Sequence, residues 1–133
     1  MTLSEAIATQ GPALRIWVAW MGVAMVATPV ILLAYKDSRR DGIVAAGALV
    51  ANLMFMQWLY GQVGYVRLLG LPHVMIWTPL AAYLWLRLRQ GDLPRLPRIA
   101  ATVFLITMLI SLVFDYVDVA RWLLGDRASL LPA

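Results

Sequence analysis

The chain reads IAATVFLITMLISLVFDYVDVARWL over residues 99–123, and this stretch decides the class of fold. It is almost wholly apolar, and its charged residues (Asp115, Asp118 and Arg121) all lie near its C-terminal end. A helix of about 20 mainly apolar residues is long enough to cross the hydrocarbon core of a bilayer. The stretch is therefore predicted to be a transmembrane helix whose charges emerge at one membrane face.

Three more stretches meet the same criterion, at residues 14–35, 42–62 and 70–86. The composition agrees with this pattern, with 62% hydrophobic residues, 14% charged residues and a mean hydropathy of +0.78. Soluble domains are nearer half apolar and a quarter charged. We therefore expect an all-α integral membrane protein in which residues 1–133 form a single domain of four transmembrane helices. Short connections between them favour an up-down-up-down bundle.

Basic residues predict the orientation of this bundle, since cytoplasmic loops carry an excess of Lys and Arg. The first and third connections hold seven basic residues: Lys36, Arg39, Arg40, Arg87, Arg89, Arg95 and Arg98. The opposite side holds four: Arg15, Arg67, Arg121 and Arg127. The first and third connections are therefore expected in the cytoplasm and both termini outside, with a bacterial inner membrane as the predicted location.

The residue types present in the chain exclude several kinds of chemistry. The chain has no Cys and one His, which excludes disulfides, thiolate catalysis and Cys-based zinc sites. Its pI near 10 comes from Arg residues in short loops, so membrane topology explains the charge better than nucleic-acid binding does. No metal and no cofactor is predicted, while a bound lipid is compatible with the pattern.

Helix packing is expected to depend on small residues, because lipid gives helices no hydrophobic reason to associate. Ala45, Ala48 and Asn52 recur on one face of the second stretch, and we interpret Asn52 as a hydrogen-bonding link between helices. The same face would offer a docking surface for a partner. Pro29 and Pro79 lie inside the first and third stretches, where proline removes a backbone donor and predicts a kink.

Polar residues at similar depth in the outer half of the membrane form the candidate site. Ionisable residues inside a membrane are costly and are functional candidates by default. Helical rise of ~1.5 Å per residue brings groups from three stretches to that depth. The candidates are Gln57, Arg67, His73, Asp115, Asp118 and Arg121.

Pairing within this set follows from helical spacing. Asp118 and Arg121 are three residues apart and are expected to pair, which leaves Asp115 to Arg67 or His73. His73 beside Asp115 suits proton transfer, and the arginines suit an anion or a lipid phosphate. A Ser111–His73–Asp115 hydrolase is formally available, but Gly-x-Ser-x-Gly is missing and Ser111 is expected to bond to its own helix backbone. No matching acidic cluster is expected in the inner half.

Three classes of function remain open. The first is a non-catalytic interaction subunit, either a homo-oligomer or part of a larger membrane complex, and it is favoured because four short-looped helices leave no soluble domain for chemistry. The second is an oligomeric ion or proton channel or transporter that uses the outer polar residues. The third is a membrane enzyme that processes a lipid or a quinone, with His73 as the acid or base.

Overall fold

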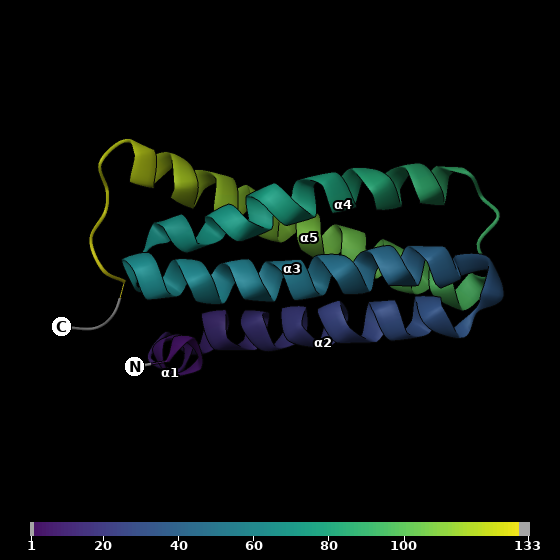
Figure 1. Ribbon diagram of the computed structural model, residues 1–133, viewed down its shortest axis with the longest axis horizontal. Helices are drawn as coiled ribbons and strands as arrows, with labels where there is room; N and C mark the ends of the chain where they lie inside the picture. Colours follow the sequence, from purple (N-terminus) through teal and green to yellow (C-terminus); the bar gives the residue numbers. More distant parts are fainter. Residues whose placement is uncertain (1, 131–133) are drawn as a thin grey trace.

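Four long helices dominate the computed structural model, which describes residues 2–130 (Figure 1). They are α2 (Pro12–Ala34), α3 (Arg39–Val63), α4 (Leu71–Arg89) and α5 (Arg95–Leu123). With their short flanking turns, all four are long and apolar enough to cross a membrane. The described residues contain no strand, so the prediction of an all-α chain with four such helices is confirmed.

Three short elements complete the chain: α1 (Leu3–Ala8), η1 (Lys36–Ser38) and η2 (Arg67–Gly70), of which the last two are 3₁₀ turns. The sequence analysis did not predict α1. Its signal is a capping box, in which the Thr2 hydroxyl accepts from the Glu5 backbone N–H and the Glu5 carboxylate accepts from the Thr2 N–H. Leu3 then packs with Leu59 and Leu69.

The helix boundaries differ from the predicted ones mainly at the start of α5. The predicted stretch begins at residue 99, whereas α5 begins at Arg95. Pro94 occupies the N-cap position and Pro97 the first turn. Backbone N–H groups of a first turn have no helical acceptor, so a proline there costs the helix no hydrogen bond. Pro29 and Pro79 lie inside α2 and α4.

The long helices surround one core. Helix α2 packs against α3 and α5, and α4 packs against the same two helices. The core is filled by apolar side chains, among which Trp77, Leu84 and Met108 are fully buried. The Trp77 ring meets Phe104 edge-on, with ring centroids 5.9 Å apart. Trp20 also links α2 to α5, since its indole N–H donates to the Thr107 hydroxyl at 3.0 Å.

Two glycines permit close approaches between elements. A Cβ at Gly42 would lie 2.7 Å from the backbone nitrogen of Leu33, so only glycine allows α3 to fold back so tightly on α2. A Cβ at Gly70 would lie 3.2 Å from the backbone of Asp115. Gly70 therefore brings η2 against α5 at the level of the candidate site.

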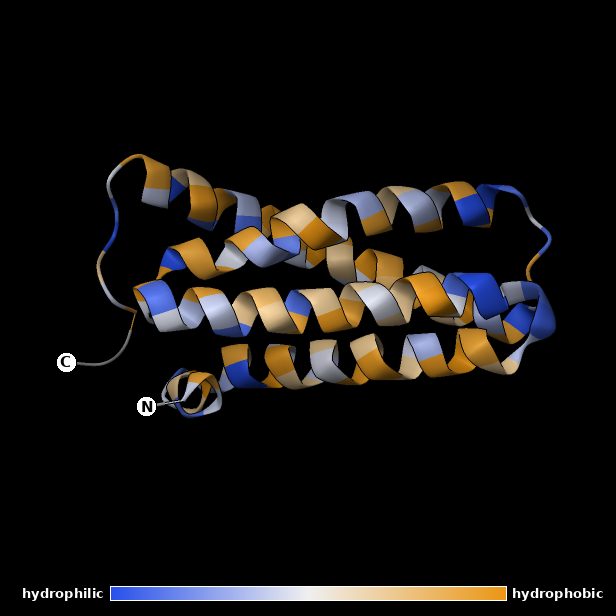
Figure 2. Cartoon of the chain, in the orientation of Figure 1, coloured by the Kyte–Doolittle hydropathy of each residue, from blue (hydrophilic) through white to orange (hydrophobic). Residues whose placement is uncertain are grey.

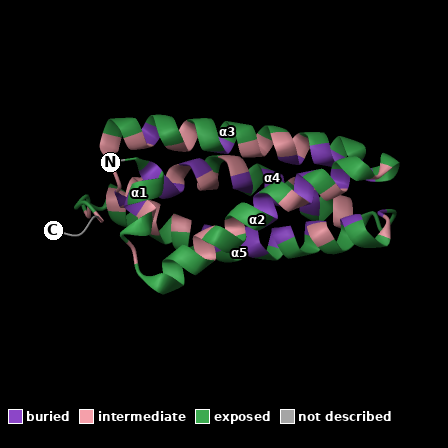
Figure 3. Ribbon diagram, turned by 90° about the horizontal axis from the view of Figure 1, so that it is seen from below, coloured by how far each residue is buried: buried purple, intermediate pink, exposed green. Residues whose placement is uncertain are grey.

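Polar and apolar residues are segregated along the helices. Exposed positions along the middle of the helices are mostly apolar (Figures 2 and 3), and no more than 39% of any membrane-span window is buried within the chain. We call the end that holds α1, η2 and the C-terminal segment the outer end. The end that holds η1 and the α4–α5 connection is the inner end. Charged residues gather at these two ends, and each end contains a polar cluster.

Candidate functional site

The Asp115 carboxylate on α5 is the centre of the polar contacts at the outer end. Of the two expected partners, His73 is the one that approaches it, with Nδ1 3.5 Å from Oδ2. The Ser111 hydroxyl was expected to bond to its own helix backbone. It instead donates to the same Asp115 oxygen at 3.2 Å. The His73 ring packs on Trp77 with centroids 4.5 Å apart. These contacts join the first turn of α4 to α5.

Arg67 organises the charges nearer the surface. Its guanidinium lies 3.1 Å from both Asp118 and Asp126, and Arg121 lies 2.8 Å from Asp126. A pair between Asp118 and Arg121 was expected. Asp118 instead pairs with Arg67, because η2 places Arg67 beside α5. Close to this group, burial raises the pKa of the Tyr65 phenol, and the Asp118 carboxylate raises it further. The ion pairs fasten η2 and the C-terminal segment to α5.

The remaining sequence candidates lie apart from this cluster. Gln57 is exposed on α3. Ala45 and Asn52 are buried inside the chain, and Ala48 is half-buried, so the face predicted to dock a partner is largely covered by the protein's own helices. The Asn52 side-chain oxygen is buried with no hydrogen-bond partner among the described residues.

The polar side chains of the outer cluster contact one another across helices. In a Ser111–His73–Asp115 hydrolase the serine hydroxyl would donate to His73 as its base, whereas here Ser111 and His73 both contact the Asp115 carboxylate. Within the described residues no group of three or more His, Cys, Asp or Glu side chains is placed to hold a metal ion. The charges of Arg67, Asp118 and Asp126 are used in ion pairs within the chain.

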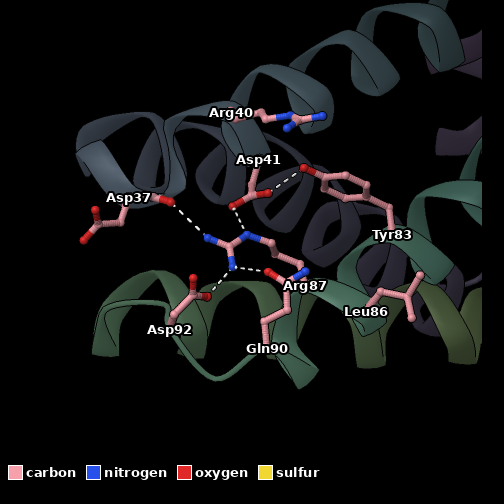
Figure 4. A pocket seen from close by; sticks show the side chains of 8 residues that line it. All are labelled: Asp37, Arg40, Asp41, Tyr83, Leu86, Arg87, Gln90 and Asp92. Atoms are coloured by element: carbon pink, nitrogen blue, oxygen red, sulfur yellow. Dashed lines mark hydrogen bonds and ion pairs between the residues drawn. The ribbon is translucent and has the colours of Figure 1, made fainter.

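A second cluster lies at the inner end, and the sequence analysis missed it (Figure 4). Asp41 in the first turn of α3 is only 2% exposed. Its carboxylate accepts from Arg87 Nε at 2.9 Å and from the Tyr83 hydroxyl at 2.6 Å, and both partners are on α4. The Arg87 guanidinium also donates to the side chains of Gln90 and Asp92 and to the backbone carbonyl of Asp37.

No matching acidic cluster was expected in the inner half, and the structure places one buried carboxylate there, that of Asp41. The predicted second stretch begins at residue 42, which leaves Asp41 in the first connection, but α3 already begins at Arg39. The missed signal lies on α4, where Tyr83 and Arg87 are four residues apart and therefore share a helix face. A donor pair on that face indicates a buried acceptor on a neighbouring helix.

Together the fold and the two clusters define a helical membrane protein with polar contacts at both ends of an apolar bundle. No family model, no curated protein and no solved structure matches this chain in the comparisons.

Proposed function

We propose that this chain spans the bacterial inner membrane as an up-down-up-down four-helix bundle. In this arrangement the inner end faces the cytoplasm and both termini lie outside. The proposal is supported by the excess of Lys and Arg in the first and third connections. It is also supported by the four long apolar helices and their largely apolar outward faces.

Within that membrane, we propose that the chain is a non-catalytic assembly subunit that pairs with a second copy of itself through the exposed face of α3. One observation carries this proposal: Gln57 is exposed although it lies within a membrane-spanning helix. It is six residues from the end of α3 at Val63, or roughly 9 Å along the helix. An amide in contact with lipid lacks hydrogen-bond partners, and polar side chains of this kind link helices in membranes.

The residues around Gln57 allow a second helix to come close. Gly47, Ala51 and Gly61 are exposed and recur on the same side of α3. A Cβ added at Gly47 or Gly61 would meet no atom of the chain within 4 Å. Packing inside the protomer therefore does not require glycine at these positions, whereas a helix packed against this face would benefit from it.

The partner is a second copy because the Gln57 amide is self-complementary. Its side chain contains both a donor NH₂ group and an acceptor oxygen. In a dimer with a two-fold axis the same patch meets itself, so each Gln57 donates to the other. A larger hetero-complex on this face is the alternative outcome of the test below.

Native mass spectrometry of the protein released from nanodiscs tests this proposal. We expect a species of twice the 14.8 kDa of one chain, and about a tenfold weaker dimer for Gln57→Leu, which corresponds to about 1.4 kcal/mol. Val30→Leu on the exposed face of α2 is the matched control and leaves the dimer unchanged. A purely monomeric protein, or equal effects of both substitutions, would overturn the proposal.

Cysteine cross-linking gives an independent measurement, because the chain contains no native Cys. Ala51→Cys is expected to form a disulfide-linked dimer in native membranes, whereas Val30→Cys does not. Cross-linking of Ala51→Cys to a different protein instead would replace the homodimer with a hetero-complex.

Transport and catalysis are less well supported. The inner and outer clusters are separated by buried apolar side chains, including Trp77, Leu84 and Met108, so a proton path through one bundle lacks intermediate carriers. For a lipid- or quinone-processing site, the acid–base candidates His73 and Asp115 are only 13% and 14% exposed, which leaves little of either side chain open to a substrate.

A further inference from the structure

Two cavities lie next to each other between α3 and α4 in the inner half of the bundle. The first has a volume of about 450 Å³, and charged residues dominate its lining. The second has a volume of about 300 Å³ and is lined mainly by apolar residues, namely Val44, Ala48, Ile76, Pro79, Leu80 and Tyr83. Tyr83 lines both cavities, so they are neighbours, and we call the two together the groove, with a polar part and an apolar part.

The polar part lies at the inner end, and the apolar part lies deeper. Asp41 and Arg87 mark the polar level. Ala48 is seven residues further along α3 than Asp41, which places it roughly 10 Å deeper in the bundle. In a bilayer the polar part therefore reaches the headgroup region and the apolar part the hydrocarbon, as an amphiphile requires.

Packing explains why the groove exists. Helices α3 and α4 make the sparsest contact among the neighbouring pairs of long helices. Ala48 is small, and Pro79 opposite it lines the same cavity. The Tyr83 ring cannot turn into the space, because its hydroxyl is fixed by the hydrogen bond to Asp41 at 2.6 Å.

The charged residues of the polar part indicate which lipid headgroup this groove would bind. Arg87 is fully engaged within the chain by Asp41, Asp92 and Gln90. Arg40 lines the same cavity and forms no ion pair with any described residue. Figure 4 shows its guanidinium beside Tyr83, on the opposite side of Asp41 from Arg87. An unpaired guanidinium of this kind matches a phosphate group.

Carboxylates on the other side of the cavity match a cation. Asp37 and Asp92 both line it and both are exposed to solvent. Asp92 pairs with Arg87 through Oδ1 only, so its Oδ2 remains available to a cation. The lining contains two arginines and three aspartates, so its net formal charge is −1. A headgroup with a phosphate alone would meet that net charge unfavourably, whereas one with a phosphate and an ammonium would be complemented at both groups.

We propose that this groove binds a glycerophospholipid with a phosphoethanolamine headgroup. The phosphate binds Arg40, the ammonium binds the carboxylates of Asp37 and Asp92, and one acyl chain lies along Tyr83, Pro79 and Ala48. This site needs the chain to span a membrane, but it does not depend on dimerisation through α3. The bound lipid would cover the sparsely packed side of the bundle.

Lipid retention measures this directly. The protein is reconstituted in nanodiscs with equal amounts of phosphatidylethanolamine and phosphatidylglycerol, and the lipids that stay bound are identified by native mass spectrometry. We expect about tenfold enrichment of phosphatidylethanolamine over phosphatidylglycerol. Equal retention of the two lipids, preference for phosphatidylglycerol or no retained lipid would overturn the proposal.

Two variants localise the binding. Arg40→Gln removes the phosphate ligand, and Ala48→Phe fills the apolar part; each is expected to lower retention about tenfold. Arg95→Gln is the control for charge, because Arg95 is an exposed residue at the inner end outside both cavities. Exposed Ile43→Phe controls for the added ring. Unchanged retention in both groove variants would place any bound lipid elsewhere.

The same spectra separate this proposal from the proposed assembly. Gln57→Leu is expected to lower the dimer fraction and leave lipid retention unchanged, whereas Arg40→Gln is expected to do the reverse. Unfolding midpoints equal to that of the parent chain confirm that both variants are folded. If the two effects always changed together, the groove would belong to the dimer interface and a lipid site within one chain would be excluded.

Discussion

The two ends of the bundle use charge in different ways. At the outer end the charge is distributed, with Arg67 shared between Asp118 and Asp126. These three side chains are between 21% and 37% exposed. At the inner end one carboxylate is nearly inaccessible, since the Asp41 side chain is 3% exposed and its partner Arg87 is 15% exposed.

This difference predicts at which end the removal of a charged side chain would lower the stability of the fold most. Ion pairs that touch water contribute little, because water solvates either partner when the other is removed. A buried carboxylate has no such replacement, so removing its partner is far more costly than the pair itself is favourable. The inner end is thus expected to be the more sensitive region, although it contains fewer ion pairs.

Arg87→Gln provides the strongest test of this contrast. It leaves Asp41 buried with only Tyr83 as a donor, and we expect a loss of about 3–5 kcal/mol in unfolding free energy. The six tryptophans allow unfolding to be followed by fluorescence during SDS titration in micelles. The double variant Asp41→Asn/Arg87→Gln removes the uncompensated charge and should recover most of the loss. A double variant as unstable as Arg87→Gln would contradict this explanation.

Asp115→Asn tests the carboxylate that Ser111 and His73 contact at the outer end. The substitution retains the shape and one acceptor oxygen but removes the charge that faces Ser111 and His73. We expect a loss of about 1–2 kcal/mol, measured by the same titration. Ser111→Ala serves as the companion variant and should cost less, because the carboxylate keeps His73. A loss of unfolding free energy as large as that of Arg87→Gln would show that the two ends are equally sensitive to the removal of a charge.

Arg67→Gln is expected to have the smallest effect, although it removes two ion pairs. Asp118 and Asp126 remain partly hydrated, so the loss should be about 1 kcal/mol or less. Added salt should reduce the difference from the parent chain further, because it screens exposed pairs. A loss that exceeds that of Asp115→Asn would show that the outer end is drier than its exposure indicates.

Sequence patterns predicted the helices better than the contacts between them. The four apolar stretches were enough to predict the four long helices, because length and hydropathy are properties of a single segment. The ion pairs at the outer end were harder to predict, because Arg121 lies three residues from Asp118 and Arg67 was expected at a similar depth. Either arginine could therefore meet an aspartate. Only the path of η2, fixed by the close approach of Gly70 to Asp115, places Arg67 at Asp118.

Asp41 shows why the inner cluster was not predicted. In the sequence it resembles its charged neighbours Arg39 and Arg40, which are exposed, and burial of a single residue at the start of a helix leaves no periodic signal. Its depth follows from Gly42, whose lack of a side chain lets α3 approach Leu33 of α2. The distinction between a solvated and a buried carboxylate thus depends on the packing of a neighbouring glycine.

The apolar layer between the two clusters has an electrical consequence. The buried polar groups within it are neutral, namely Thr28, Asn52 and Thr107, and the charged residues lie near the helix ends. A membrane potential performs work of about 2.3 kcal/mol per 100 mV only on a charge that moves across the layer. Residues 2–130 place no charged side chain inside the layer, so energising or discharging the membrane should leave the conformation of the bundle unchanged.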